Sequence, residues 1–343
     1  MIKLNYKNLL YTLSNNAIFK KISKKYKYEG DAIIFCYHRV LPEKLMNKNN
    51  YPDKSLVTSI TNFENHLKFF KDNYACISID DLLDTSKDYN YKHKICITFD
   101  DGYLDNIDYV LPIIDKYQIP ITIYISSRFL EKNVYLWWYE LWELIDQNIL
   151  KNFFWKGKDY SYNINSKNLK INTYKTLSKL MLNETDFNQK KLLEIMSGSK
   201  ERINYEHIFM KKKHLLELDE NPLVTIGSHS HSHTRFSILN KTETKKEIES
   251  SIKILNQYTN NKVSHFAYPY GQSSDFNSDN TEIIKACGLK TIANTINKNI
   301  SVNNIDTFHL PRYGISNLDD LNSINVKISG FHSLVKDRIN GII

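Results

Sequence analysis

The sequence predicts an α/β fold in which parallel strands and amphipathic helices alternate around one large core. Short apolar runs rich in β-branched and aromatic residues recur along the chain, which is typical of buried strands. Apolar residues at helical spacing follow most of these runs, and the alternation is interrupted once, between about residues 150 and 215. Repeated strand–helix units imply a parallel sheet, and their number favours a barrel over an open sheet.

The first half of the chain contains four expected strands and two expected helices. The strands cover residues 32–37, 74–79, 94–99 and 121–125. Thr61 and Glu64 form a capping-box pattern at the start of the first helix. The apolar face of that helix has Phe63, Leu67 and Phe70, and the face of the second has Leu104, Ile107, Leu111 and Ile114.

The second half resumes the same alternation after the interruption. Strands are expected at residues 224–226, 266–268 and 291–294. A helix over 244–255 places Ile248, Ile252 and Leu255 at spacings of four and three residues. Gly288 ends the next helix, because glycine tolerates the left-handed backbone that commonly follows a last turn.

Residues 150–215 form a separate segment of different pattern. A hairpin is expected over 153–164 around Gly157, and short helices are expected over 173–182 and 189–196. We interpret the segment as a cap inserted on the side of the barrel where the loops after the strands carry function. The chain then divides into an N-terminal amphipathic segment, a first barrel part, the inserted cap and a second barrel part, at residues 1–30, 31–149, 150–215 and 216–343.

Composition is that of a folded protein with a modest basic excess. Hydrophobic residues make up 41% of the 343 residues, which allows a sizeable core and argues against wholesale disorder. The net charge of +8 comes from dispersed lysines, so we expect no nucleic-acid partner. The excess would suit an anionic substrate or an anionic membrane surface.

The cysteines and the N-terminal segment bear on location. The cysteines, which form no C-x-x-C pair, are Cys36, Cys76, Cys96 and Cys287. We expect buried free thiols, as in a reducing compartment. Residues 1–30 have no secretory pattern, and no later run is long enough to span a bilayer. Their apolar residues are interleaved with lysines, so the segment is a surface helix packed on its domain or a peripheral contact with a membrane. We therefore expect a cytoplasmic location, with the inner membrane surface as the site of any such contact.

Asp100 and Asp101 directly follow an expected strand. In a β/α barrel, catalytic residues gather where strands end. Adjacent carboxylates on an extended chain point in different directions, so one can bind a metal while the other acts as a base. An isolated Asp-Asp-Gly sequence would otherwise be a simple turn.

A histidine cluster follows the expected strand at residues 224–226. If the chain turns into a helix there, His229 and His233 share one face, whereas His231 points elsewhere. Two imidazoles and one carboxylate make a three-ligand site with an open position, which is typical of catalytic rather than structural metal sites. The pattern therefore indicates a catalytic metal centre.

Three motifs resemble those of the polysaccharide deacetylases of the NodB-homology type. They are Thr-Phe-Asp-Asp-Gly at 98–102, His-Ser-x-x-His at 229–233 and Phe-Ala-Tyr-Pro-Tyr-Gly at 266–271. The resemblance implies a distorted (β/α)7 barrel and a divalent metal, usually zinc. It further implies that Asp100 is the base, that the metal ligands are Asp101, His229 and His233, and that the Tyr270 backbone N–H, after Pro269, helps to bind the oxyanion.

The sequence lacks the family's fourth motif, which pairs an Asp with a Trp, and two further departures bear on the active site. Ala267 stands where the third motif usually carries an arginine, and the usual C-terminal Leu-x-His that supplies the general acid is missing. However, Phe-Cys-Tyr-His-Arg-Val at 35–40 resembles the N-terminal motif of the biofilm poly-N-acetylglucosamine deacetylases. In that branch the barrel is circularly permuted and this histidine replaces the acid, so the resemblance gives the role to His38. The next candidates are His265 and His309.

Two further residues have weaker patterns. Leu310-Pro311-Arg312 closes what we interpret as the last strand, and Arg312 could supply the cation that Ala267 does not, or form a surface salt bridge. Trp138, in an adjacent tryptophan pair, could stack on a sugar ring or belong to the core.

The function that the resemblance implies is hydrolysis of an N-acetyl group. The expected substrate is an N-acetylhexosamine in a surface polysaccharide or its lipid-linked precursor, and the product is acetate. The same groups would serve another deacylation, of an O-acetyl ester or a formamide on a glycan. A non-catalytic glycan-binding module is the alternative from a different class.

Overall fold

The computed structural model describes residues 31–48, 56–84, 86–87 and 93–330. The amphipathic segment expected at residues 1–30 lies outside these ranges. Within them, no helix combines the length and the apolar character that crossing a bilayer requires.

A curled parallel sheet forms the centre of the molecule. Seven of its strands run in the spatial order β11-β10-β9-β6-β5-β1-β12, and β4 adds to β5 outside that path, counted over the described residues. The strands are β1 Ala32–Tyr37, β4 Ala75–Cys76, β5 Lys94–Phe99, β6 Ile121–Ile125, β9 Val224–Ser228, β10 His265–Ala267, β11 Thr291–Ala293 and β12 Tyr313–Gly314. A parallel bridge between Ala293 and Leu310 brings the chain just before β12 against β11. The two ends of the sheet therefore meet, and the predicted class, a distorted (β/α)7 barrel, is confirmed.

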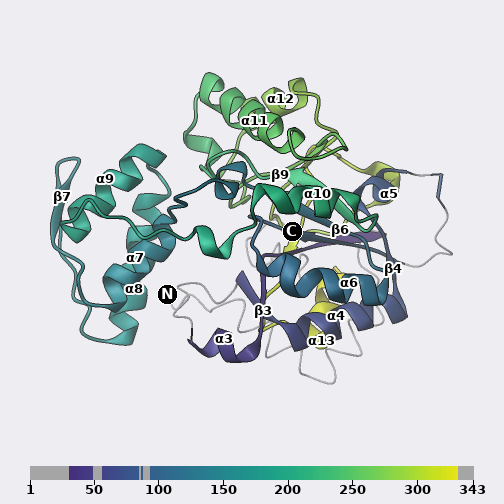
Figure 1. Cartoon of the computed structure of the whole chain (residues 1–343), viewed down its shortest axis with the longest axis horizontal. Helices are drawn as coiled ribbons and strands as arrows, with labels where there is room; N and C mark the ends of the chain where they lie inside the picture. Colours follow the sequence, from purple (N-terminus) through teal and green to yellow (C-terminus); the bar gives the residue numbers. More distant parts are fainter. Residues whose placement is uncertain (1–30, 49–55, 85, 88–92, 331–343) are drawn as a thin grey trace, which may run out of the picture.

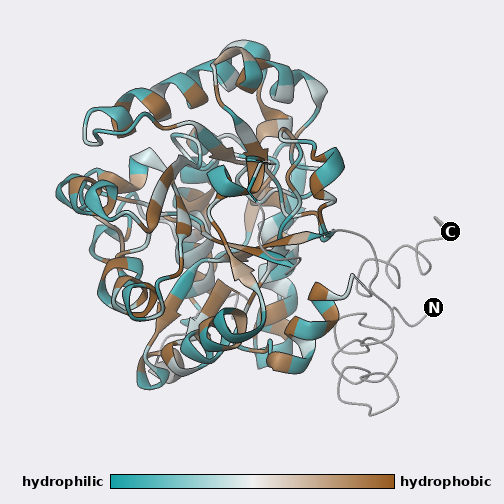
Figure 2. Ribbon diagram, turned by 90° about the vertical axis from the view of Figure 1, so that its right-hand side faces the viewer, coloured by the Kyte–Doolittle hydropathy of each residue, from teal (hydrophilic) through white to brown (hydrophobic). Residues whose placement is uncertain are grey.

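Helices cover the outside of this barrel (Figure 1). They are α4 Ile60–Asn73, α5 Ile79–Leu83, α6 Leu111–Tyr117, α10 Lys212–Glu220, α11 Lys241–Asn256, α12 Ser278–Ala286 and α13 Leu321–Ile328. Their outer surfaces are largely hydrophilic, whereas hydrophobic residues concentrate on the strands and on the inner helix faces (Figure 2). The short elements are β2 Arg39–Leu41, β3 Val57–Ser59, α3 Glu43–Lys48, a π-helical turn η2 Asn106–Val110, and the 3₁₀ turns η3 Ser127–Leu130, η4 Glu206–Ile208, η5 Phe236–Ile238 and η6 Val302–Asn304.

Strand β1 shows why these runs form interior strands. All six of its residues are buried, because one face packs on the helices and the other lines the barrel. Ile33, Phe35 and Tyr37 join the cluster beneath the helices. Ala32 and Ile34 join the cluster inside the barrel, which also contains the small side chains of Ala267 and Ala293. A strand buried on both faces needs a continuous apolar run, and that run made the strand predictable.

A helical unit stands beside the barrel, at the left of Figure 1. It comprises α7 Trp137–Asp146, the antiparallel hairpin of β7 Phe153–Trp155 and β8 Lys158–Tyr160, α8 Lys167–Met181 and α9 Asp186–Ser197. These elements share one hydrophobic cluster of their own, including Leu141, Leu177 and Leu192. The hairpin and both helices expected within 150–215 are present, and α7, which precedes residue 150, packs in the same cluster. We call α7 to α9 the side unit.

Two local predictions in the first half are wrong. Helix α4 is capped by Ser59, whose hydroxyl accepts the Asn62 N–H at 3.1 Å, so Thr61 and Glu64 form no capping box. The strand expected at 74–79 ends after Cys76. Ser78 accepts the Asp81 N–H and starts α5, because a serine hydroxyl satisfies a free N–H of a first helical turn.

Candidate active site

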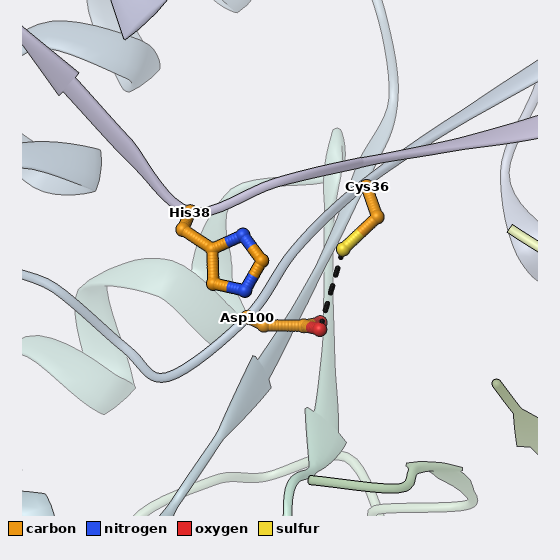
Figure 3. Close-up of side chains that lie close together, drawn as sticks. All are labelled: Cys36, His38 and Asp100. Carbon is orange, nitrogen blue, oxygen red and sulfur yellow. Dashed lines mark hydrogen bonds between the residues drawn. The ribbon is translucent and has the colours of Figure 1, made fainter. Parts of the chain in front are cut away.

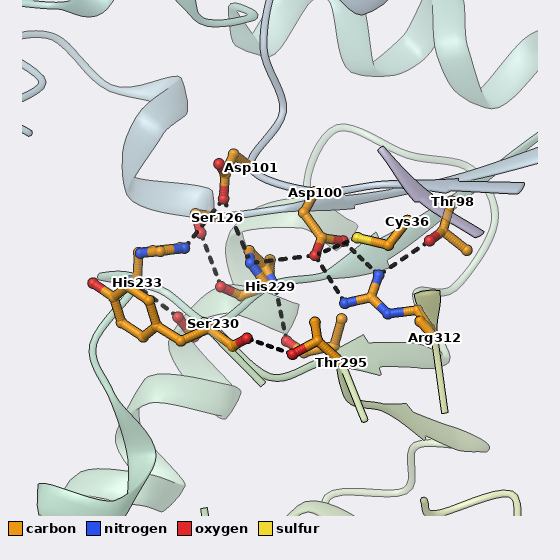
Figure 4. A network of polar contacts seen from close by, with 12 residues as sticks. Cys36, Thr98, Asp100, Asp101, Ser126, His229, Ser230, His233, Thr295 and Arg312 are labelled. Atoms are coloured by element: carbon orange, nitrogen blue, oxygen red, sulfur yellow. Dashed lines mark hydrogen bonds and ion pairs between the residues drawn. The ribbon is translucent and has the colours of Figure 1, made fainter. Parts of the chain in front are cut away.

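Five polar side chains gather at the end of the barrel where the strands finish. His38 follows β1, Asp100 and Asp101 follow β5, and His229 follows β9, with His233 in the same loop. Figure 4 shows Asp100 lying between Arg312 on one side and the group of Asp101, His229 and His233 on the other. Parallel strands place these residues together although up to about two hundred residues separate them in the chain.

The turn after β5 directs the two aspartates apart. Asp101 has a φ of 78° and Gly102 a φ of 85°. The chain therefore turns sharply at these two residues, just after the end of β5. A Cβ on Gly102 would also lie 2.9 Å from Cγ2 of Ile125, which leaves room for glycine alone. The left-handed conformation is costly for an aspartate, and such conformations cluster at functional sites.

Asp101, His229 and His233 have the geometry of three metal ligands. Oδ1 of Asp101 lies 3.5 Å from Nε2 of His229 and 3.1 Å from Nε2 of His233. A tetrahedral zinc site with bonds of about 2.1 Å has ligand atoms roughly 3.4 Å apart, which fits both distances. Among the described residues, Oδ1 of Asp101 is buried without a hydrogen-bond donor, although carboxylate oxygens in interiors are normally paired. The donor set and this orphaned oxygen fit a divalent ion.

His229 is oriented and held neutral as a metal ligand requires. Its Nδ1 contacts the carbonyl oxygen of Ala267 at 2.8 Å, so Nδ1 carries the hydrogen and Nε2 presents its lone pair toward Asp101. Burial lowers the pKa of His229 to about 4, against the opposing pull of Asp100. The imidazole is therefore unprotonated near neutral pH.

The predicted helical turn between His229 and His233 is wrong. The segment forms an irregular loop in which Ser230 and His233 have φ values of 67° and 58°. The Ser230 hydroxyl accepts the His233 N–H at 3.0 Å and closes the loop. The two imidazoles converge through this turn rather than through helical spacing, and His231 instead contacts the Ser127 hydroxyl at 2.9 Å.

Arg312 forms a buried bidentate pair with Asp100. Its guanidinium donates to Oδ1 and Oδ2 of Asp100 at 2.7 and 2.8 Å, to Oγ1 of Thr98 at 3.1 Å and to the carbonyl of Asn294 at 3.0 Å. Both charged groups are buried, so the surface salt bridge considered from the sequence is wrong. Burial is the largest single influence on the pKa of Asp100 and raises it, but the charge and hydrogen bonds of Arg312, together with the neighbouring His229 and His38, outweigh burial and hold that pKa below its ordinary value. Asp100 is therefore an ionised carboxylate.

Packing inside the barrel explains how the guanidinium fits. It lies over the Tyr124 ring, 5.2 Å from the centroid. A Cβ on Gly227 would lie 2.4 Å from Cδ1 of that ring, so the glycine before the histidine loop leaves the space that Tyr124 occupies.

His38 and Cys36 both approach Asp100 from β1. One potential ligand atom from each of the three residues lies within 4.8 Å of the others, and Figure 3 shows the imidazole and the thiol beside the carboxyl group. Cys36 donates to Oδ2 of Asp100 at 3.3 Å, a contact that no sequence pattern indicated. The His38 carbonyl oxygen accepts a hydrogen bond from Nδ2 of Asn106 at 3.0 Å, which fixes the backbone after β1. Cys36 and Cys96 are buried free thiols as expected, whereas Cys76 and Cys287 are partly exposed.

The two alternative acid candidates lie away from this centre. His265 begins β10 at the opposite end of the barrel, where its Nε2 lies 3.3 Å from Asp80. His309 is exposed and contacts Asp306.

Aromatic residues line the side of the centre that faces the side unit. The Tyr270 ring lies 4.9 Å from the ring of His233, and its hydroxyl accepts Nε1 of Trp137 at 3.3 Å. Tyr270 follows Pro269 and has a φ of 63°. Its carbonyl oxygen accepts a hydrogen bond from the Thr295 hydroxyl at 2.8 Å. The half-buried Trp138 ring lies 5.2 Å from His233. The sequence pattern singled out the backbone of Tyr270, whereas the structure also places its side chain against the ring of His233.

The arrangement combines the groups that acyl hydrolysis requires. Three side chains with metal-ligand geometry adjoin the ionised carboxylate of Asp100, and the His38 imidazole lies beside that carboxylate. A metal ion held by the three side chains would polarise a carbonyl group. A carboxylate can accept a proton from water, and an imidazole can protonate a leaving group.

Comparisons with known proteins identify a family and similar folds. A family model described as polysaccharide deacetylase matches residues 87–157 and 159–292. The fold is similar to a de-N-acetylase from Aggregatibacter actinomycetemcomitans, with a TM-score of 0.57 and 16% identity over 86% of this chain and 99% of that one. A polysaccharide deacetylase from Bacillus cereus gives 0.55 and 14% over 87% and 68%, and IcaB from Ammonifex degensii gives 0.51 and 16% over 88% and 98%. No curated protein sequence matches the chain.

Proposed function

Because the chain belongs to the polysaccharide deacetylase family, whose members are hydrolases, we propose that it removes the N-acetyl group from an N-acetylhexosamine. The products are acetate and a free amino sugar. The proposed substrate is a surface polysaccharide or its lipid-linked precursor. The convergence of Asp101, His229 and His233 beside an arginine-paired Asp100 is the observation that carries the proposal.

Asp101, His229 and His233 would hold the metal ion, for which we propose zinc. Two imidazoles and one carboxylate are a common catalytic zinc set. When bound, such an ion polarises the acetyl carbonyl and makes a neighbouring water more acidic.

Asp100 is proposed to be the general base. Its pairing with Arg312 keeps the carboxylate ionised, so it can accept a proton from the attacking water. The same pairing fixes both carboxylate oxygens, and a base held in one orientation loses little freedom on reaching the transition state. Arg312, just before β12, thus supplies the cation that the third motif usually provides at the position of Ala267.

The remaining residues would handle the oxyanion, the leaving group and the sugar. The Tyr270 N–H, in the sharp turn after Pro269, would donate to the oxyanion, an interaction typically worth about 3 kcal/mol. His38 would protonate the amine nitrogen as its bond to the acyl carbon breaks. Trp138 would pack against the sugar ring beside His233.

Acetate release tests this proposal. Purified protein with added zinc should release acetate from N-acetylhexosamine oligomers or lipid-linked N-acetyl sugars, and the Asp100→Asn variant should bind the metal without turnover. Release of formate, or turnover of O-acetyl esters alone, would instead identify another deacylase. Glycan binding without any release would identify a binding module, which the buried ionised base argues against because a pure binding site has no use for it.

A further inference from the structure

The loop that joins the two histidine ligands adopts a backbone that a short peptide would not keep by itself. We call residues 229–233 the ligand loop. It contains two non-glycine residues in the left-handed region, Ser230 and His233. Such conformations persist only where surrounding groups hold them. Something outside the loop must therefore fix it.

Glu247, on helix α11, is one outside side chain that holds the loop directly. Its Oε2 accepts two consecutive backbone N–H groups of the loop, from His231 at 3.1 Å and from Ser232 at 2.8 Å. Its Oε1 accepts the Ser232 hydroxyl at 2.8 Å. One carboxylate thus receives three hydrogen bonds from the stretch between the two ligands, and bonds to a charged acceptor are stronger than neutral ones.

The same carboxylate reaches the residue after His233 through Ser232. Because the Ser232 hydroxyl donates to Glu247, the Thr234 hydroxyl is the donor in its 2.7 Å contact with Ser232. His233 therefore lies between two residues that are both tied to Glu247.

Helix α11 is itself well fixed against the start of the loop. Ser251, one turn after Glu247, contacts the hydroxyl of Ser228 at 2.8 Å, and Ser228 directly precedes the ligand loop. Ile248 and Leu255 are fully buried on the same helix. Glu247 and Ser251 thus form one helical face that holds the end of β9 and the loop after it.

We infer that Glu247 is a positioning residue that preorganises His229 and His233 for the metal ion. Its carboxylate binds backbone N–H groups of the loop instead of joining the ligand group of Asp101 and the two histidines. A loop already in the ligand geometry has less freedom to lose on binding, so the metal affinity of the site depends on this glutamate. The inference rests on the metal site of the proposed function.

Zinc affinity of the full chain, measured by competition with a chromophoric chelator, tests the inference without any turnover assay. Glu247→Ala should weaken zinc binding by roughly 10- to 100-fold, the range for losing a residue that orients metal ligands. The Glu247→Gln side chain has the same length and keeps a carbonyl oxygen that can accept both backbone N–H groups. The zinc affinity of this variant should therefore stay within about threefold of that of the unaltered protein. Glu249→Ala is the matched control, because Glu249 is exposed on the same helix and pairs with Lys245. It should bind zinc as the unaltered protein does.

Melting temperatures of the metal-free proteins separate positioning from simple structural support. Lower metal-free stability in Glu247→Ala with an unchanged zinc affinity would overturn the inference while leaving the proposed function intact. If Glu247→Ala does not fold, Glu247→Asp takes its place, since it keeps the charge but is one methylene too short. An Asp variant that binds zinc as tightly as the Gln variant would also overturn the inference. Unaltered protein that binds no zinc would refute both proposals, whereas the expected affinity pattern without acetate release would refute only the proposed activity.

Discussion

Replacing Arg312 with methionine should destabilise the protein through the carboxylate that it leaves behind. Arg312→Met removes both hydrogen bonds to Asp100 together with those to Thr98 and Asn294. Asp100 then remains buried as a charged group without its cation. Removing one partner of a buried ion pair typically costs about 3–5 kcal/mol, and we expect a loss in that range in the free energy of unfolding.

The loss should depend on pH in a direction set by Asp100. In the unaltered protein the pKa of Asp100 lies below its unfolded value, so its contribution to stability is present above that value and lost in acid. Without Arg312, burial dominates and raises the pKa of the folded state, so the ionised form opposes folding as pH rises. The difference in unfolding free energy between variant and unaltered protein should therefore be larger near about pH 8 than near about pH 5.

A double-mutant cycle isolates the charge from the lost packing. Asp100→Asn added to Arg312→Met neutralises the stranded carboxylate, so the double variant should be more stable than Arg312→Met alone. We expect a coupling energy of about 2 kcal/mol or more from denaturant unfolding of metal-free protein. A double variant no more stable than Arg312→Met, or a loss equal at both pH values, would refute this account of the pair.

Three further predictions concern the proposed centre. Asp101→Ala should lose the bound divalent ion, measured by metal analysis, because two imidazoles alone hold it weakly, and full metal content would remove Asp101 from the ligand set. His38→Ala should lower kcat on an N-acetyl substrate by roughly a hundredfold with metal content unchanged, and the deficit should be smaller on an O-acetyl ester, whose leaving group needs less protonation. An equal deficit on both substrates would indicate a structural role for His38. Trp138→Ala should raise KM by about two- to tenfold through loss of ring packing, with kcat and metal content retained, whereas loss of the ion would show that the ring supports His233 rather than the sugar.

Interior strands were the most predictable part of the fold. The expected spans 32–37, 94–99 and 121–125 coincide with β1, β5 and β6, because burial on both faces leaves a continuous apolar run in the sequence. The strand expected at 74–79 was too long, since a serine hydroxyl competes for the backbone at Ser78. Such local hydrogen bonds override an apolar pattern.

The candidate site was predictable where short motifs carry it and not where distant contacts do. From the sequence we expected the aspartates and histidines to follow strands at one end of the barrel. The structure brings these side chains close together. It suggested a helix between His229 and His233, but the loop depends on acceptors in α11 that no local pattern shows. The contact of Cys36 with Asp100 joins residues on neighbouring strands, so it follows from sheet register and not from spacing.

The position of the arginine that pairs with Asp100 has an evolutionary consequence. Ala267 belongs to the cluster inside the barrel, and Arg312 enters the same interior from the chain just before β12. We therefore expect one buried guanidinium beside Asp100, presented from one of these two positions. Among relatives, arginine should therefore occur at one of these two positions with a small residue at the other, so that the two columns covary although neither is invariant. An alignment scored one position at a time would treat Ala267 as the loss of an arginine. An alignment that scores positions 267 and 312 together should instead find one positive charge in each relative.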